Sequence, residues 1–503
     1  MTLKIFGFLD FFAVLCTTEL AENTPLEVQS LKKYAPTAPW RFLERNNHQN
    51  QNTKHYMITF IVALFVIGYL CIALESVLKI NKAAPALLMC VGCWVLYMLD
   101  AGSFIQSFRG VNVAAADVSQ WVNEHILLSH LGDTCEILFF LMGAMTIVEI
   151  VDANGGFNFV RDRLQTKHKH TLLWRVTFMT FVLSAVLDNL TTSIVMIMVL
   201  RKLVKDHKDR LIYASCIILS ANAGGAFSPI GDVTTIMLWI KGNITTGGVI
   251  TELLIPSIVS VVVPTFLLQF KLKGQLETNH TAEAGDALHF SRLERNMVFF
   301  IGVGGLIFVP IFRFLTGLPP FMGILLVLGL LWSITEFFYR SKGHVDENMQ
   351  MRVTQLLKRI DMSTILFFLG ILMAVATLQE TGVLRTFGQA LNEASGGNHY
   401  IVTGVIGVVS SIVDNVPLVA GCMGMYDILP GTDFAVDGIF WQLLAYCAGV
   451  GGSMLIIGSA AGVVVMGLEK ITFGWYMRHI TWIAFVGYLA GIGAYAVEKM
   501  LGM

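Results

Sequence analysis

The sequence predicts an all-α polytopic integral membrane protein with two inverted repeats, re-entrant hairpins and unwound transmembrane helices. First, the 503-residue chain is 55% hydrophobic and only 14% charged, whereas soluble proteins carry about 25% charged residues. Second, apolar runs of about 20 residues recur, which is the length that a helix needs to cross the hydrocarbon. Third, several sequence blocks occur twice. The bilayer core admits only helices and closed barrels, and the sequence lacks the alternating segments of about ten residues that barrel strands show, so helices are expected.

The apolar runs define the expected elements in chain order. The candidate spans, four of which (172–200, 211–240, 400–425 and 439–468) are interrupted, are 57–78, 84–104, 133–152, 172–200, 211–240, 249–270, 297–317, 320–339, 362–380, 400–425, 439–468 and 472–497. They divide the chain into a poorly defined N-terminal segment (1–56), accessory transmembrane helices (57–130), a first repeat (131–245), connecting helices (246–361) and a second repeat (362–503). The N-terminal segment is compatible with a signal sequence, a surface helix or a frayed tail.

Composition and motifs exclude several functions. The net charge of −1 gives no basic surface for nucleic acid. The sequence contains neither a His and Cys cluster with zinc spacing nor the patterns His-Glu-x-x-His and Gly-x-Ser-x-Gly, so we expect no enzyme and no cofactor. Cys90 and Cys93 have the spacing of a redox motif, but they lie in an apolar helix and are interpreted as packing residues.

Matching blocks indicate an internal duplication. Ile137–Leu141 recurs as Ile365–Leu369 at an offset of 228, and Asp188-Asn189 recurs as Asp414-Asn415 at an offset of 226. Gly224-Gly225 similarly corresponds to Gly451-Gly452, at an offset of 227. Separated blocks that share nearly the same offset indicate two related halves of the protein.

The charges of the loops predict that the two repeats are inverted. Loop 201–210 has five basic and two acidic residues, whereas its counterpart 426–437 has three aspartates and no basic residue. Loop 161–170 is also basic. Short loops rich in Lys and Arg remain on the cytoplasmic side. Loops 161–170 and 201–210 are therefore expected in the cytoplasm and loop 426–437 outside, as in many secondary carriers; the expected membrane is the bacterial inner membrane.

Each repeat contains two interruptions. Asp and Asn compete with helical backbone hydrogen bonds, so Asp188-Asn189 and Asp414-Asn415 are expected at the tips of re-entrant hairpins; a kinked continuous helix is the alternative. Residues 220–235 contain three glycines and a proline, which favour an unwound segment. The second repeat has a similar glycine-rich stretch at 448–462, although Ser459 replaces Asp232.

The polar residues of these interruptions are suited to a hard cation, because they supply oxygen ligands and amides without sulfur or imidazole. A charged residue at the bilayer centre is costly, on the order of 3 kcal/mol, and is retained where it has a function. The candidate cation- and proton-binding residues are Asp188, Asn189, Asn222, Asp232, Thr234, Thr235, Asp414, Asn415, Ser453 and Ser459, supported by Ser184, Thr191, Thr192 and Ser410. Sodium is expected at Asp188, Asn189, Asp232, Asp414 and Asn415.

These motifs resemble those of the NhaD-type sodium/proton antiporters of the ion-transporter superfamily. The resemblance rests on residues 184–192, 220–235, 410–417 and 449–462 and covers most of the chain from about residue 57. It implies exchange of sodium or lithium for protons, with no bound cofactor, in a homodimer embedded in lipid. Pro417 and Ser459 depart from a symmetric pattern.

Proton coupling requires carboxylates that can hold either a proton or a cation. An exposed aspartate titrates near about 3.9, so protons compete at neutral pH only when the carboxylate is buried. Glu136 and Glu149 lie on one apolar stretch, between three and four helical turns apart, so one helix face could carry both. They are expected either on a proton route or at the ends of a span in ion pairs.

The main alternative is a sodium-coupled symporter of an anion such as a dicarboxylate, or an arsenite-type carrier, on the same fold. In that case Ser and Thr side chains and helix N-termini would hold the anion. The hairpin tips and unwound stretches contain no Arg or Lys, which disfavours this alternative.

Overall fold

The computed structural model describes residues 40–502, except 74, 158–159, 161–162, 273, 277–290, 342–352 and 413. The described residues form helices and loops, with no named β-strand among them. Seven of these helices are long and apolar enough to cross a membrane, or eight if the bent pair α5 and α6 counts as one span. The helices are α3 (Trp40–Ala73), α4 (Glu75–Leu78), α5 (Ala83–Leu99), α6 (Ala101–Arg109), α7 (Val118–Val122), α8 (Leu128–Ala153), α10 (Lys169–Leu187), α11 (Asn189–Leu203), α12 (His207–Ala226), α13 (Val233–Ile240), α14 (Thr246–Gln269), α15 (Arg292–Thr316), α16 (Pro320–Ser341), α17 (Val353–Leu356), α18 (Met362–Glu380), α19 (Val383–Ala394), α20 (His399–Ser410), α21 (Asn415–Met425), α22 (Ile439–Gly451), α23 (Ala460–Glu469), α24 (Phe473–His479) and α25 (Thr481–Met500).

Two expected spans are divided in the structure. The run 84–104 forms α5 and α6, which meet at an angle of 85°. Asp100 lies at the bend, where its carboxylate accepts a hydrogen bond from Ser103 Oγ at 2.7 Å, and such local bonds compete with helix continuation. The run 472–497 forms the short helix α24 followed by the span α25. At the first of these breaks, a polar residue inside an apolar run marks a position that hydropathy alone does not reveal.

The N-terminal expectation is tested only in part. Residues 1–39 lie outside the described residues, as do residues 161–162 of the basic loop. From Trp40 onward the chain is helical, so the latter part of the segment 1–56 belongs to α3.

Helices α10 and α12 run parallel to each other. At one end, Lys169 forms an ion pair with Asp209 at 2.6 Å. At the other end, Ser184 Oγ donates a hydrogen bond to the carbonyl oxygen of Ala221 at 2.5 Å. Because both contacts join corresponding ends, the two helices point in the same direction.

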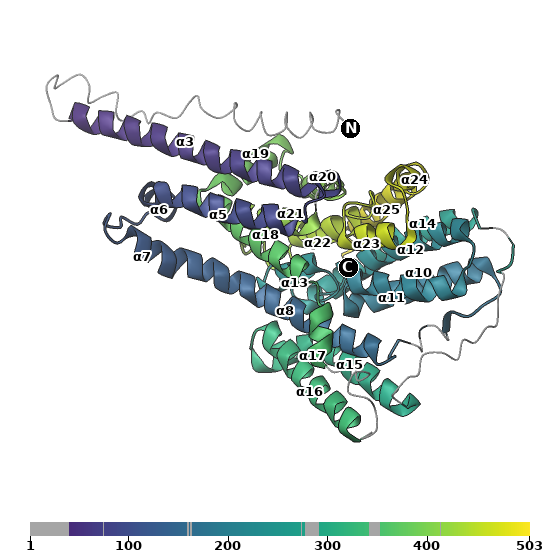
Figure 1. Ribbon diagram of the computed structural model, residues 1–503. Coiled ribbons are helices and arrows are strands. Elements are labelled where there is room, and N and C mark those ends of the chain that lie inside the picture. Colours follow the sequence, from purple (N-terminus) through teal and green to yellow (C-terminus); the bar gives the residue numbers. More distant parts are fainter. Residues whose placement is uncertain are drawn as a thin grey trace.

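Helix α11 runs antiparallel to α12, and therefore to α10. Its first residue, Asn189, donates a hydrogen bond to Asn222 near the end of α12. Near its other end, Arg201 shares the carboxylate of Glu469 with Arg210 at the start of α12. The chain thus reverses between α10 and α11 to form a helical hairpin, as Figure 1 shows.

The second repeat contains the same arrangement in α20, α21 and α22. Ser410 Oγ donates to the carbonyl oxygen of Ala448 at 2.8 Å, which matches the bond from Ser184. At the far end, the rings of His399 and Tyr426 both lie against Phe440, with centroid distances of 6.0 and 4.7 Å. Helices α20 and α21 therefore form a second hairpin beside α22.

Glycine permits close backbone contact between each hairpin and the following unwound segment. A Cβ atom on Gly231 would lie 2.6 Å from the carbonyl oxygen of Ser184, and one on Gly458 would lie 2.5 Å from that of Ser411. Real Cβ atoms essentially never come this close. The two contacts differ by 227 residues in both partners, whereas the bonds of Ser184 and Ser410 come from positions that differ by 226, so the contacts in the two halves are shifted by one residue in the hairpins.

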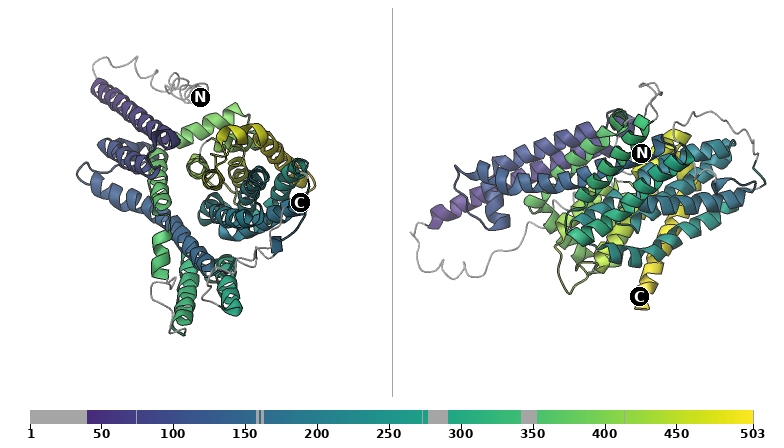
Figure 2. Two further views of the ribbon diagram at one scale, coloured as in Figure 1. Left: turned by 45° about the vertical axis from the view of Figure 1, so that its right-hand side comes forward. Right: turned by 90° about the horizontal axis from the view of Figure 1, so that it is seen from below.

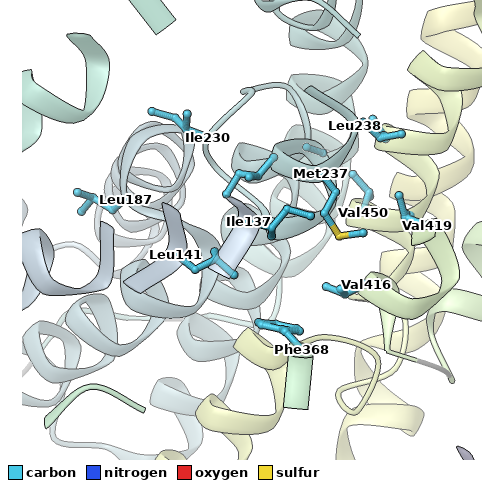
Figure 3. Close-up of a cluster of buried hydrophobic side chains, with 14 of the residues drawn as sticks. Ile137, Leu141, Leu187, Ile230, Met237, Leu238, Phe368, Val416, Val419 and Val450 are labelled. Carbon is cyan, nitrogen blue, oxygen red and sulfur yellow. The ribbon is translucent and has the colours of Figure 1, made fainter. Parts of the chain in front are cut away.

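The helices are arranged as a bundle with a row of helices along one side (Figure 2). The bundle contains both hairpins with α12, α14, α22 and α25, and the row follows the order α3, α5, α18, α8, α16 and α15. Where row and bundle meet, apolar side chains of α8 and α18, including Ile137 and Phe368, lie close to Val416 of α21 (Figure 3). This packing encloses the polar segments between the broken helices.

Candidate functional site

Four helix N-termini begin at the predicted polar residues. Asp188, Asp232, Asp414 and Ser459 are the N-caps of α11, α13, α21 and α23, and each side chain accepts a hydrogen bond from a backbone N–H of the first turn. N-caps of these residue types satisfy backbone donors that a helix leaves unpaired. The sequence analysis identified these four residues as ligands but did not identify their role in starting the helices.

A chain of hydrogen bonds between buried side chains connects the two repeats. Asn189 Nδ2 donates to Asn222 Oδ1 at 3.1 Å and to Asp232 Oδ2 at 2.9 Å. From the second hairpin, Asn415 Nδ2 also donates to Asp232 Oδ2, at 3.4 Å. Asn222 Nδ2 in turn donates to Ser459 Oγ at 2.9 Å. Asp232 thus receives one amide from each hairpin and lies at the centre of the network.

The two hairpin aspartates have different partners. Asp188, at a positive φ of 82°, accepts from the backbone N–H and the hydroxyl of Thr191 at 2.7 and 2.8 Å. Asp414 accepts from the backbone N–H of Val416 and forms an ion pair with Lys82 at 3.1 Å. The residues that directly follow them, Asn189 and Asn415, both donate to Asp232 and thereby link the two hairpin tips.

The remaining hydroxyls around the network fall into two groups. Several bind backbone carbonyl oxygens. Ser184 and Ser410 join separate helices in this way, whereas Ser193, Thr235 and Ser453 bind carbonyl oxygens three or four residues earlier in the chain. Thr192 is fully buried, and its hydroxyl has no hydrogen-bond partner among the described residues. An unpaired buried hydroxyl is costly, and this one is available to a ligand.

Glu136 and Glu149 lie outside this network. Glu149 forms an ion pair with Arg359 at 3.1 Å, and both side chains are partly exposed. Glu136 lies about 20 Å away from Glu149 along the axis of α8. The placement of Glu149 agrees with the alternative in which it marks the end of a span in an ion pair.

Sequence reasoning missed Lys82, which enters the site from the loop before α5. It is distant from Asp414 in the chain and lies outside both repeats. The one signal available was a lysine directly before an apolar run, which is usually interpreted as a residue at the membrane surface.

The assembled donors are suited to an alkali cation. Within the described residues no group of three or more His, Cys, Asp or Glu side chains could hold a metal ion. The site instead presents carboxylate, amide and hydroxyl oxygens, and hard cations prefer such oxygen ligands.

A family model described as "Citrate transporter" (CitMHS) matches residues 62–443. Two curated relatives from Arabidopsis thaliana are similar in sequence to this chain. "Sodium/proton antiporter 1" is 46% identical over 86% of this chain and 71% of its own length, and "Sodium/proton antiporter 2" is 43% identical over 86% and 97%. The chain is an NhaD-type member of this family. Bacterial members are more distant: the "Na(+)/H(+) antiporter NhaD" of Alkalimonas amylolytica is 29% identical over 86% of this chain and 89% of its own.

The fold of this NhaD-type protein is also found in a solved structure. The YdaH transporter of Alcanivorax borkumensis matches 78% of this chain and 90% of its own with a TM-score of 0.52 and 11% sequence identity. This similarity concerns the fold alone. The apolar helices and the relatives named as antiporters establish an integral membrane protein.

Proposed function

We propose that this protein exchanges sodium or lithium for protons across a membrane by alternating access. The observation that carries the proposal is the buried carboxylate of Asp232 at the N-terminus of α13, which accepts from the amides of Asn189 and Asn415. These two residues directly follow Asp188 and Asp414, the N-caps of α11 and α21. Relatives named sodium/proton antiporters support it. The cation and the proton are transported substrates, so no resident cofactor is required.

In this proposal the carboxylates hold either protons or a cation. Sodium binds the oxygens of the site and displaces protons, which leave on the same side. A buried site that contains several unbalanced carboxylates crosses a low-dielectric barrier at high cost. Neutralisation by either substrate lowers that cost, so the loaded states change sides more readily than the empty one.

The two helical hairpins belong to the parts of the protein that are proposed to move during the transport cycle. We infer that the hairpins α10–α11 and α20–α21 re-enter the membrane from opposite sides as parts of two inverted repeats. The matched bonds of Ser184 and Ser410 and the matched contacts of Gly231 and Gly458 support that relation. Inverted repeats of this kind move against each other in many secondary carriers.

The proposal also includes the orientation of the protein in the membrane and its oligomeric state. Loops 161–170 and 201–210 are placed on the cytoplasmic side and loop 426–437 outside, following the charge rule. The higher identity to plant relatives than to bacterial ones favours a membrane of a eukaryotic cell over the bacterial inner membrane. A homodimer, which the family resemblance implies, is the proposed assembly.

An anion symporter is the second candidate, because helix N-termini attract anions and the matching family is described as citrate transporters. Against it, three of the four N-termini already carry the carboxylate of their own cap residue. Sodium-dependent uptake of citrate or of a dicarboxylate into proteoliposomes distinguishes this activity from exchange.

The test of exchange uses Asp188→Asn in proteoliposomes that contain a pH-sensitive dye. The variant is expected to lose sodium-dependent pH changes while it is inserted at the normal level. Asp117→Asn, at an exposed position, serves as the control and keeps full exchange. Full exchange by Asp188→Asn would refute the role of Asp188.

A further inference from the structure

The two hairpin tips differ in one charged group. In the described part of the chain, Asp414 forms an ion pair, with Lys82, whereas the bonds to the carboxylate of Asp188 come from Thr191. The distance between Lys82 Nζ and Asp414 Oδ2 is 3.1 Å, and the side chains are 23% and 18% exposed. This pair is mostly removed from water, where charges interact more strongly than at a surface.

Several contacts position Lys82 at Asp414. Its Nζ atom lies 4.2 Å from the centre of the Phe367 ring, a cation–π contact. Its backbone N–H donates to Glu75 Oε1 at 3.1 Å. The preceding residue, Asn81, exchanges two hydrogen bonds with Ser363 at the start of α18, at 2.8 and 3.0 Å. The loop before α5 is therefore attached to α18, and the ammonium group is directed to the hairpin tip.

Among the described residues, no lysine pairs with the carboxylate of Asp188 as Lys82 pairs with that of Asp414. Gly143 of α8 packs against Ile324 of α16, and Gly370 of α18, one residue before the position that matches Gly143 at the offset of 228, packs against Ala86 of α5. Helix α16 thus takes the place relative to α8 that α5 takes relative to α18. The segment before α16, residues 317–319, is Gly-Leu-Pro and contains no basic residue.

We propose that the ammonium group of Lys82 is a tethered cation that occupies the position at Asp414, so that the transported sodium binds on the Asp188 and Asp232 side. The inference rests on the proposed function. It divides the proposed cation site into a half at Asp414, which Lys82 occupies, and a half at Asp188 and Asp232, which binds sodium. Lys82 acts through Asp414 as a positioning residue: it supplies a fixed positive charge close to the site and thereby limits how strongly, and how many, cations bind.

The test is sodium binding to the purified full-length protein, measured by isothermal titration calorimetry at constant pH and ionic strength. Lys82→Met removes the positive charge and keeps approximately the length of the side chain. This variant is expected to raise the apparent sodium affinity on the order of tenfold, because a positive charge near the sodium site is removed from surroundings of low dielectric constant. Lys82→Arg keeps the charge and is expected to stay within about twofold of the wild type. Lys79→Met removes the same charge from an exposed position in the same loop and is expected to bind sodium like the wild type.

A double variant separates a charge effect from damage to the fold. Adding Asp414→Asn to Lys82→Met removes both members of the ion pair, so affinity is expected to return toward the wild-type value. Wild-type affinity in Lys82→Met, or an equal change in Lys79→Met, overturns the inference. If the wild-type protein does not bind sodium at all, the proposed function fails instead, and the two failures are distinguishable.

Discussion

Glu469 offers a quantitative test of how the two repeats are held together. This carboxylate lies at the end of α23, is fully buried, and accepts from Arg201 and Arg210 at 2.6 Å each. Arg201 also binds the carbonyl oxygen of Leu468. The three charges connect the first hairpin and α12 to a helix of the second repeat, so Glu469→Gln removes the group that joins them.

The expected magnitude follows from burial. Removing one partner of a buried ion pair costs about 3–5 kcal/mol. The two arginine side chains are 43% and 20% exposed, so water compensates part of the loss, and we expect the free energy of unfolding to fall by about 2–3 kcal/mol. In Glu149→Gln the broken pair is with Arg359, whose side chain is 50% exposed, and the expected loss is below about 1 kcal/mol.

The assay is reversible unfolding of each purified variant in mixed detergent micelles as the denaturing detergent is increased. The account expects Glu469→Gln to unfold at a clearly lower fraction of denaturing detergent than Glu149→Gln. Equal losses in the two variants, or none in either, would show that Glu469 does not join the repeats energetically.

Three further predictions concern the site. Gly231→Ala is expected to destabilise the protein by about 1–3 kcal/mol, because the added methyl group meets the carbonyl oxygen of Ser184; Gly247→Ala, which meets nothing within 4 Å, is the control in the same unfolding assay. Asn222→Ala removes a partner of both Asn189 and Ser459 and is expected to cost about 1–3 kcal/mol and to weaken sodium binding, whereas the exposed Asn112→Ala changes neither. Apparent sodium affinity measured in transport is expected to fall as the pH is lowered, by up to about tenfold per pH unit if one proton competes; affinity that does not change with pH contradicts a shared site.

Sequence reasoning was most effective where a polar residue conflicts with its surroundings. Asp188-Asn189 and Asp414-Asn415 stand out in apolar runs because they disfavour a continuous helix and are costly in lipid. The structure places helix starts at these positions, and it brings Asn189, Asn222, Asp232 and Asn415 together.

The duplicated sequence motif could not reveal contacts that occur in one half of the protein and not in the other. The duplicated motif does not reveal that Asn189 and Asn415 both donate to one carboxylate, that of Asp232 in the first repeat. Lys82 and Glu469 were missed for one physical reason. A charged residue at the end of an apolar run usually faces water, and only the folded structure shows that these two meet distant partners in the chain.

The most direct test of the shared site is the number of protons released when sodium binds. Calorimetric titrations of the purified protein with sodium, in buffers that differ in ionisation enthalpy, give this number at fixed pH. We expect net proton release in the wild-type protein near neutral pH and a smaller release in Asp232→Asn, because that variant lacks the central carboxylate. Sodium binding without any proton release in the wild type would contradict the account.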